Sequence, residues 1–385
     1  MPFSFDLTPS WYDRSMMGRD GEEQAAFGPA GMHRLSDAAR ALDGVESRIQ
    51  NAATDLFRDG AAGLSDQCRV QIAQLMRGMI TAIEDELRIR VCEALPDDAP
   101  PELYAALGSA RVQIAMPLLE RTDLLREADL VAATLRRVDE HRLALALGRD
   151  SPFHVAELSQ RLLDLGDQAV SEAVMALLVA DSRRYDQFGD PALARTDLPS
   201  GPHRRLLWAV AAALRHYMIH QHGMAEGRAD LLLVDAVSGL LTEHEDEDTL
   251  EGRAEALADL LWHRKLIDDA LLLGALEEGW LALFTAAVAK RAGIDAAGVW
   301  SMLLEPSGTM LGTILRAIDC ERTTAVTILW RVATAEAVAE EVVIERADAF
   351  DALTVREAAE AVLIWRLDPN YRRAVLEIGE SGRRR

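Results

Sequence analysis

The apolar positions along this chain follow a helical period, and the longest such pattern lies near its start. Between residues 32 and 56, apolar residues recur at alternating steps of three and four, a heptad pattern typical of a long helix in a coiled coil. Gly60 and Gly63 are placed to end this helix, and Ser65 is placed to cap a second helix with a matching apolar stripe. The pattern therefore predicts a long antiparallel helical hairpin over residues 32–95.

The predicted helices become shorter after this hairpin, and two polar segments divide them into blocks. The first segment is PDDAPP at residues 96–101, which has the composition of a rigid linker, and the second is the turn-rich stretch 182–202. Short helices with one apolar face, such as 128–138 and 141–147, are typical of an α-solenoid of the HEAT-like kind. The predicted organisation is a mobile arm at 1–31, the hairpin at 32–95, a first repeat block at 102–181, a second repeat block at 198–366 and a tail at 367–385.

One stretch of the first block is similar to a stretch of the second block. Residues 118–166 match the sequence that begins at Leu260 in one ungapped register, and Gly166 falls on Gly308. Self-similar units of short helices are the signature of stacked helical repeats. The predicted fold is therefore all-α, with a long N-terminal helical hairpin followed by a HEAT-like α-solenoid that contains an internal duplication.

The composition favours helices, and the charge limits the classes of partner. The chain has 385 residues, of which 49% are hydrophobic and only 5% aromatic, and its net charge is −22. An acidic surface repels nucleic acid and anionic lipid, so we expect no membrane contact and a protein partner of basic character. Three cysteines without metal-like spacing, no signal peptide and no long apolar run predict a soluble cytoplasmic protein.

Three phrases of the sequence resemble the alphaproteobacterial family called domain of unknown function 2336. They are LSDQCRVQIAQLMRGMITAIEDELR, then PLLERTDLLREADLV with EHRLALALGRD, and DALLLGALEEGWLALFTAAVAKRAGI. The resemblance covers residues 64–340, and its first phrase includes a Glu-x-x-x-Arg ending at Glu84 and Arg88. It implies a helical-repeat protein without an assigned function, and it supplies no catalytic residues.

The hairpin predicts a homodimer. Two helices leave one apolar side open, whereas two copies related by a two-fold axis supply the four helices that close a core. An alternative is that the hairpin folds back onto the repeats of its own chain. The predicted dimer interface consists of Leu42, Ile49, Leu56, Ile72, Leu75, Met79 and Ile83.

Histidines provide two candidate sites. His216 and His220 are four residues apart on one predicted helix, and with His222 they are candidate ligands for Zn²⁺ or a similar metal, although histidines are also common at helix ends. His33 opens the heptad helix with Asp37 one turn later, which weakly resembles the phosphoacceptor helix of histidine-kinase dimerisation hairpins. Each site has a simpler interpretation as an ordinary exposed histidine.

The clustered charges are interpreted as solvated surface. Glu84 and Arg88 have the spacing of an exposed i,i+4 ion pair, and the acidic segment TEHEDEDTLEG lacks the central glycine of a calcium-binding loop. It is interpreted as a solubilising turn.

The sequence contains no recognisable catalytic motif, phosphate-binding loop or dinucleotide fingerprint. We therefore expect a non-enzymatic protein-interaction scaffold or regulator that needs no cofactor. A first alternative is a phosphotransfer or pseudo-kinase protein acting through His33. A second is a HEAT-like nucleic-acid enzyme, for which the sequence offers only small basic clusters at residues 203–205 and 290–291.

Overall fold

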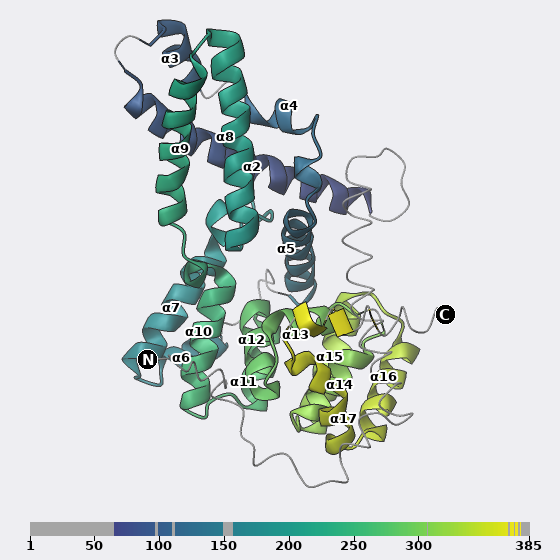
Figure 1. Cartoon of the computed structure of the whole chain (residues 1–385). Helices are drawn as coiled ribbons and strands as arrows, with labels where there is room; N and C mark the ends of the chain where they lie inside the picture. Colours follow the sequence, from purple (N-terminus) through teal and green to yellow (C-terminus); the bar gives the residue numbers. More distant parts are fainter. Residues whose placement is uncertain are drawn as a thin grey trace, which may run out of the picture.

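A computed structural model shows that the chain folds into two helical lobes (Figure 1). The structure describes residues 65–96, 99–109, 112–148, 157–305 and 307–368, together with 370–372, 374, 375 and 378. Within these residues every regular element is a helix, and the only bridge of β type joins Tyr185 to Pro191. The predicted all-α class is confirmed, and the stacked helices are consistent with a solenoid.

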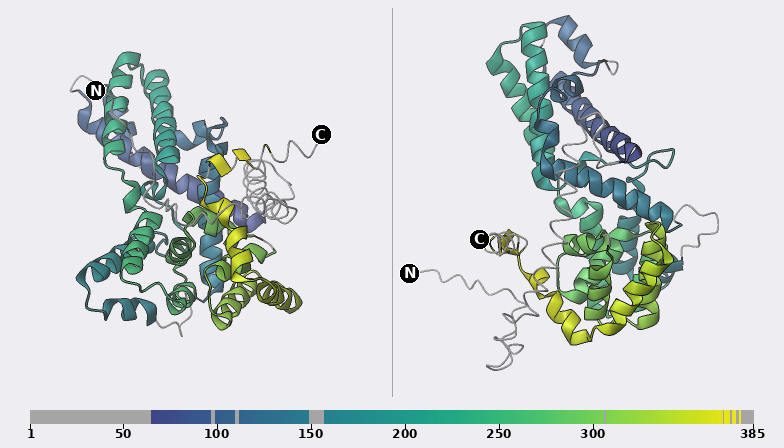
Figure 2. Two further views of the ribbon diagram at one scale, coloured as in Figure 1. Left: turned by 60° about the horizontal axis from the view of Figure 1, so that its bottom comes forward. Right: turned by 90° about the vertical axis from the view of Figure 1, so that its right-hand side faces the viewer.

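The first lobe is built around a helical hairpin that projects away from the second lobe in all three views (Figures 1 and 2). Its core contains the buried side of the hairpin and of a long helix that crosses it. The elements of this lobe are α2 (Asp66–Ala94), α3 (Pro101–Leu107), α4 (Ala115–Leu119), η2 (Leu124–Arg126), η3 (Arg195–Asp197), α8 (Ser200–His222) and α9 (Glu226–Thr242).

The second lobe packs around one central helix, which is buried along nearly its whole length. That helix is α12, and its Ala- and Leu-rich sequence lets neighbouring helices approach it on every side. The elements of this lobe are α6 (Glu157–Leu163), α7 (Gln168–Ser182), η4 (Asp246–Asp248), α10 (Leu250–His263), α11 (Asp269–Glu277), α12 (Leu281–Ala292), α13 (Ala296–Leu303), α14 (Thr309–Ala317), α15 (Arg322–Ala335), α16 (Glu340–Ala352), α17 (Val355–Ala361) and η5 (Leu363–Arg366).

Helix α5 (Ala128–Ala146) links the two lobes because its ends lie in different hydrophobic cores. Its first half contributes Leu130 and Leu135 to the core of the first lobe, and its second half contributes Leu143 to the core of the second. After α7 the chain returns to the first lobe for α8 and α9, and then enters the second lobe again at α10. Each core therefore takes residues from both of the repeat blocks predicted from the sequence.

Local sequence signals set many of the helix ends. Ser65 caps α2 as predicted, since its hydroxyl accepts a hydrogen bond from the backbone N–H of Cys68. Asp167 caps α7 in the same way, and Thr354 forms a capping box with Glu357 at α17. Gly223, with φ of +67°, ends α8 in the left-handed conformation that favours glycine and so allows the tight turn into α9.

Helix α5 differs from the prediction, because it is one continuous helix rather than two. The sequence interpretation ended one helix at Val138 and began the next at His141, which placed a break at Asp139 and Glu140. All three side chains are instead buried within the helix. They belong to a polar junction between the lobes.

The predicted internal duplication is not confirmed. In the matched register, the single helix α5 corresponds to two helices, α11 and α12, which are separated by Gly279 and Trp280. Gly279 has φ of +68°, which interrupts the helix there, while the matching position, Arg137, lies within α5. Shared leucine spacing therefore does not give the two stretches the same structure.

Candidate functional site at the junction of the lobes

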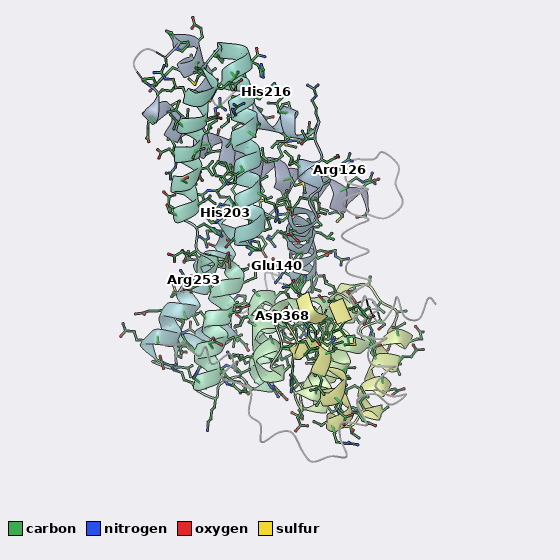
Figure 3. The ribbon with its side chains drawn as sticks, viewed as in Figure 1. Arg126, Glu140, His203, His216, Arg253 and Asp368 are labelled. Carbon is green, nitrogen blue, oxygen red and sulfur yellow. The ribbon has the colours of Figure 1, made fainter. Side chains whose placement is uncertain are left out.

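A cluster of buried charged side chains lies between the lobes, around the middle of α5. Figure 3 labels Glu140 and His203 there. Arg137 is 1% exposed, and its guanidinium donates hydrogen bonds to the backbone carbonyls of Ala192 and Arg184. The same guanidinium lies over the ring of Tyr185, 5.0 Å from its centroid. Arg137 thus fixes the chain segment that returns from α7 to the first lobe.

Arg184 is surrounded by three carboxylates from three different elements. Its guanidinium lies 2.7 Å from Glu251 of α10, 3.3 Å from Glu140 of α5 and 3.5 Å from Asp197 of η3. Burial alone would lower the pKa of Arg184, but the three carboxylates outweigh burial and raise this pKa above its usual value. Arg184 therefore stays charged and holds α5, η3 and α10 together.

Asp197 is the least satisfied member of this cluster. Its side chain is fully buried, and neither carboxylate oxygen makes a hydrogen bond with the described residues. Burial raises the pKa of Asp197, and the nearby charges of Arg184 and Arg183 only partly oppose this. An ionised carboxylate without hydrogen bonds is costly to bury, so this part of the junction is weakly held.

Two buried histidines lie beside this cluster, at the base of the α8–α9 hairpin. His203 is fully buried, the side chain of His244 is 4% exposed, and their ring centroids are 4.1 Å apart. Both ring nitrogens of His203 and Nδ1 of His244 have no hydrogen-bond partner among the described residues. Burial, together with His244 and Arg195, lowers the pKa of His203 to about 4, and Asp246 opposes this shift. The His203 ring is therefore neutral at pH 7.

Asp246 links the histidine pair to the start of α8. Its carboxylate accepts hydrogen bonds from the backbone N–H of Ser200 at 3.0 Å and from the Ser200 hydroxyl at 2.5 Å. The same carboxylate lies 3.3 Å from Nε2 of His244. The hydrogen bond from the Ser200 hydroxyl lowers the pKa of Asp246, so this group stays ionised in mild acid.

The acidic segment around Asp246 is mostly exposed, as interpreted from the sequence, but two of its acids also bind groups within the chain. Asp246 caps the start of α8, Asp248 pairs with Arg253, and the backbone carbonyl of Asp248 accepts a hydrogen bond from Arg183. Sequence reasoning missed this role because an acidic run looks the same whether it faces solvent or a helix terminus.

A small pocket opens onto the junction. The enclosed space in it has room for about one water molecule. It is lined by Glu140, Leu177, Asp181, Leu250, Trp280, Leu281, Ala282 and Leu283. Its size and mostly apolar lining fit a packing gap better than a substrate site.

The histidines predicted to bind a metal are only partly brought together. His216 and His220 have ring centroids 4.3 Å apart, whereas His222 packs edge-on against Tyr217. No group of three histidine, cysteine or acidic side chains in the described residues is arranged to hold a metal ion. The predicted three-histidine site is therefore not formed in this part of the chain.

The predicted dimer interface is divided by the structure. Four of its residues are at most 4% exposed and pack in the core of the first lobe: Ile72, Leu75, Met79 and Ile83. These four residues therefore follow the alternative given above, in which this segment packs against helices of its own chain. Leu42, Ile49 and Leu56 lie outside the described residues, as does the phosphoacceptor candidate His33. The homodimer and phosphotransfer through His33 stay predictions.

The interpretation of Glu84 and Arg88 as a solvated pair is wrong. They are 3% and 4% exposed, and Glu84 also accepts hydrogen bonds from the backbone N–H groups of Ile114 and Ala115. Arg88 donates to the backbone carbonyls of Ala106, Leu107, Ser109 and Val112. We call this pair and the backbone groups it binds the α2 clamp, because it fixes the connection between α3 and α4.

The small basic clusters named for nucleic-acid binding are largely neutralised. Arg205 pairs with Glu127 and Asp129, while Lys290 and Arg291 pair with acidic residues of α10 and α11. His203 is buried. Arg204 is exposed and makes no ion pair with the described residues, so the pairing reduces the free positive charge at these positions without removing it, which weakens the nucleic-acid alternative.

Sequence reasoning missed the junction in part because two of its central residues lie in a segment interpreted as a boundary between the repeat blocks. Arg184 and Asp197 belong to the turn-rich segment 182–202, and His203 follows it directly. The composition of this segment is that of a solvated loop. The residues next to an arginine in the sequence do not show whether its side chain is buried. The polar run in α5 was the one usable signal, since its neighbours keep the helical period.

Together the fold and the junction define an all-α protein of two lobes with a cluster of buried charged side chains between them. The model of the DUF2336 family, described as an uncharacterised protein conserved in bacteria, matches residues 114–362. The chain belongs to this family. No curated protein and no solved structure was found to match the chain. None of the described helices combines the length and hydropathy needed to cross a membrane.

Proposed function

We propose that this protein is a non-enzymatic interaction scaffold that binds a basic protein partner on the outer face of α16. The observation that carries this proposal is the composition of that face. Glu341, Ile344, Glu345 and Asp348 follow one another at helical spacing, and all are exposed. Val343, Arg346 and Phe350 on the opposite face are buried in the second lobe.

The acidic side chains of this face differ from those at the junction. Glu340, Glu341 and Glu345 have no cationic partner among the described residues, whereas the junction carboxylates surround Arg184. Ile344 is 56% exposed in the middle of the acids. An apolar side chain within a charged rim is the usual arrangement of a protein-binding hot spot, and the rim charges steer a partner of opposite charge.

The other charged clusters described above are used internally. Glu84, Arg88 and Arg184 bind partners within the chain, and the incompletely paired Asp197, His203 and His244 side chains are buried, so neither cluster presents an exposed acid or base to a substrate. This supports a binding role over an enzymatic one. The uncompensated acidic face is also consistent with the chain's net charge of −22.

The test compares two matched double variants in affinity purification from the cells that encode the protein. Ile344→Ser/Glu345→Lys changes the proposed face of α16. Val234→Ser/Asp235→Lys makes the same two changes on the exposed face of α9, where Val234 is 50% exposed. A partner captured by the wild type is then purified, and its Kd for all three proteins is measured at low and high salt.

We expect the α16 variant to weaken binding at least ~10-fold, or about 1.4 kcal/mol, and the α9 variant to change it less than ~2-fold. Added salt should weaken the wild-type complex, because screening reduces the attraction between exposed charges. Unchanged binding by the α16 variant would place the interface elsewhere. Turnover in a metabolite screen, without any captured partner, would contradict the scaffold role.

A further inference from the structure

The buried pair of His203 and His244 lacks the hydrogen bonds that would make it stabilise the fold. A buried imidazole normally has at least one hydrogen bond, because an unpaired polar atom costs about 1–3 kcal/mol. Here three of the four ring nitrogens of His203 and His244 have no partner among the described residues. The ring centroids are 4.1 Å apart with the planes tilted by 44°, and at this distance two positive charges in a buried site would repel each other strongly.

The position of the pair gives it control over one connection between the lobes. His203 lies in the first turn of α8, and His244 lies in the segment that leads from α9 to α10. The contact between the two rings thus holds residues 243–249, which enter the second lobe, against the base of the first lobe. Asp246 strengthens this contact through its two hydrogen bonds to Ser200.

The charges around the pair disfavour a proton on His203. Burial lowers the pKa of His203 most, and the positive charge of Arg195 in η3 lowers it further. Two carboxylates, Glu86 of α2 and Glu243 at the end of α9, face Arg195 rather than the rings. Glu243 also pairs with Arg90 of α2. The other anion near His203 is the Asp246 carboxylate, which already accepts a hydrogen bond from the backbone N–H of Ser200.

From this geometry we propose that His203 and His244 form a proton-operated latch at the base of the α8–α9 hairpin. With His203 neutral the rings stay in contact and the junction is closed. A proton on His203 has no partner in the closed form, so its uptake requires the ring to leave its buried position. Residues 243–249 then separate from the start of α8, and the first lobe is released from the second on this side.

The direction of the pH effect follows from linkage. The folded pKa of His203 is about 4, below the ordinary value of 6.5, so the open form takes up protons more readily as the pH falls from 6.5 towards 4. The latch is therefore closed above pH 6.5. By pH 5 the ratio of open to closed forms should rise by about 10- to 30-fold.

The experiment is hydrogen–deuterium exchange of the full-length protein at pH 7.5 and pH 5.0, corrected for the intrinsic pH dependence of exchange. We expect peptides that cover residues 195–205 and 243–250 to exchange about 10- to 30-fold faster at pH 5.0 after this correction. Peptides from α12 serve as the internal reference and should be unchanged. Equal acceleration in α12 would mean global unfolding and would overturn the proposal, as would no acceleration at the junction.

Three variants separate the latch from other titrating groups. His203→Phe keeps an aromatic ring beside His244 without a titrating nitrogen, and its junction peptides should show no pH response. His216→Phe, on the exposed face of the same helix, and Asp197→Asn should both respond like the wild type. A normal response in His203→Phe would overturn the latch, and so would its loss in Asp197→Asn. If His203→Phe does not fold, His244→Phe decides: a weakened response supports the latch, and a wild-type response overturns it.

Discussion

The α2 clamp and the lobe junction are both buried charge clusters, but they differ in how completely their atoms are paired. In the clamp, Arg88 donates five hydrogen bonds and Glu84 accepts from two backbone N–H groups as well as from Arg88. At the junction, Asp197 and His203 are equally buried, yet neither makes a side-chain hydrogen bond among the described residues. The comparison teaches that burial alone does not show whether a polar cluster is fixed.

The difference follows from what each cluster must hold. The clamp binds backbone carbonyls at the end of α3 and in the loop that leads to α4. The junction instead joins α5, η3, η4, α8 and α10, which are distant in sequence, through side chains. A saturated clamp makes one rigid lobe, whereas an incompletely paired junction allows two lobes to move.

The largest effect is expected from Arg88→Met in the α2 clamp. This substitution leaves Glu84 buried without its cation and removes the donors of four backbone carbonyls, so we expect a loss of about 3–5 kcal/mol in the free energy of unfolding. Urea denaturation monitored by circular dichroism measures this loss. Arg356→Met removes an exposed ion pair with Glu360 and should cost less than about 0.5 kcal/mol. Similar losses for both variants would contradict the clamp.

A smaller loss is expected from Arg184→Met at the junction. Its removal leaves Glu140, Asp197 and Glu251 without a shared cation, but Arg137 and Arg136 remain near two of them. We therefore expect a loss of about 2–3 kcal/mol by urea denaturation. Adding Asp197→Asn should recover part of it, because one unpaired carboxylate is then removed. A double variant that is less stable than Arg184→Met alone would show that Asp197 is paired after all.

The smallest effect at neutral pH is expected from His203→Phe. Replacing an imidazole without hydrogen bonds by an apolar ring should change the free energy of unfolding by less than about 1 kcal/mol at pH 7.5. The folded pKa of His203 is lowered, so the wild type loses stability as the pH falls from 6.5 towards 4. Between pH 7.5 and pH 5.0 the wild type should therefore lose about 2 kcal/mol of its free energy of unfolding through His203, and the variant should not show this loss. Equal pH dependence of both proteins in urea denaturation would refute this prediction.

Sequence patterns predicted where the helices form better than which side chains contact one another in the fold. The Ser65 and Asp167 caps and the all-α class could be predicted, because capping residues and helical periods act over a few neighbouring positions. The junction could not be predicted, because Arg184 contacts Glu251 and Glu140 across long sequence separations. Glu84 and Arg88 illustrate the same limit. Their i,i+4 spacing is identical in an exposed pair and in a buried clamp, and only the loop that covers them decides which it is.

The central claim is that the junction opens more easily than the α2 clamp, and native-state hydrogen exchange at pH 7.5 in increasing, non-denaturing urea tests it most directly. The backbone N–H groups of Ile114 and Ala115 report the clamp, and those of Leu198 and His203 report the junction. We expect the clamp amides to exchange only through unfolding of the whole lobe, while the junction amides exchange through an opening of lower free energy. Equal opening free energies, with the same urea dependence, would contradict the account.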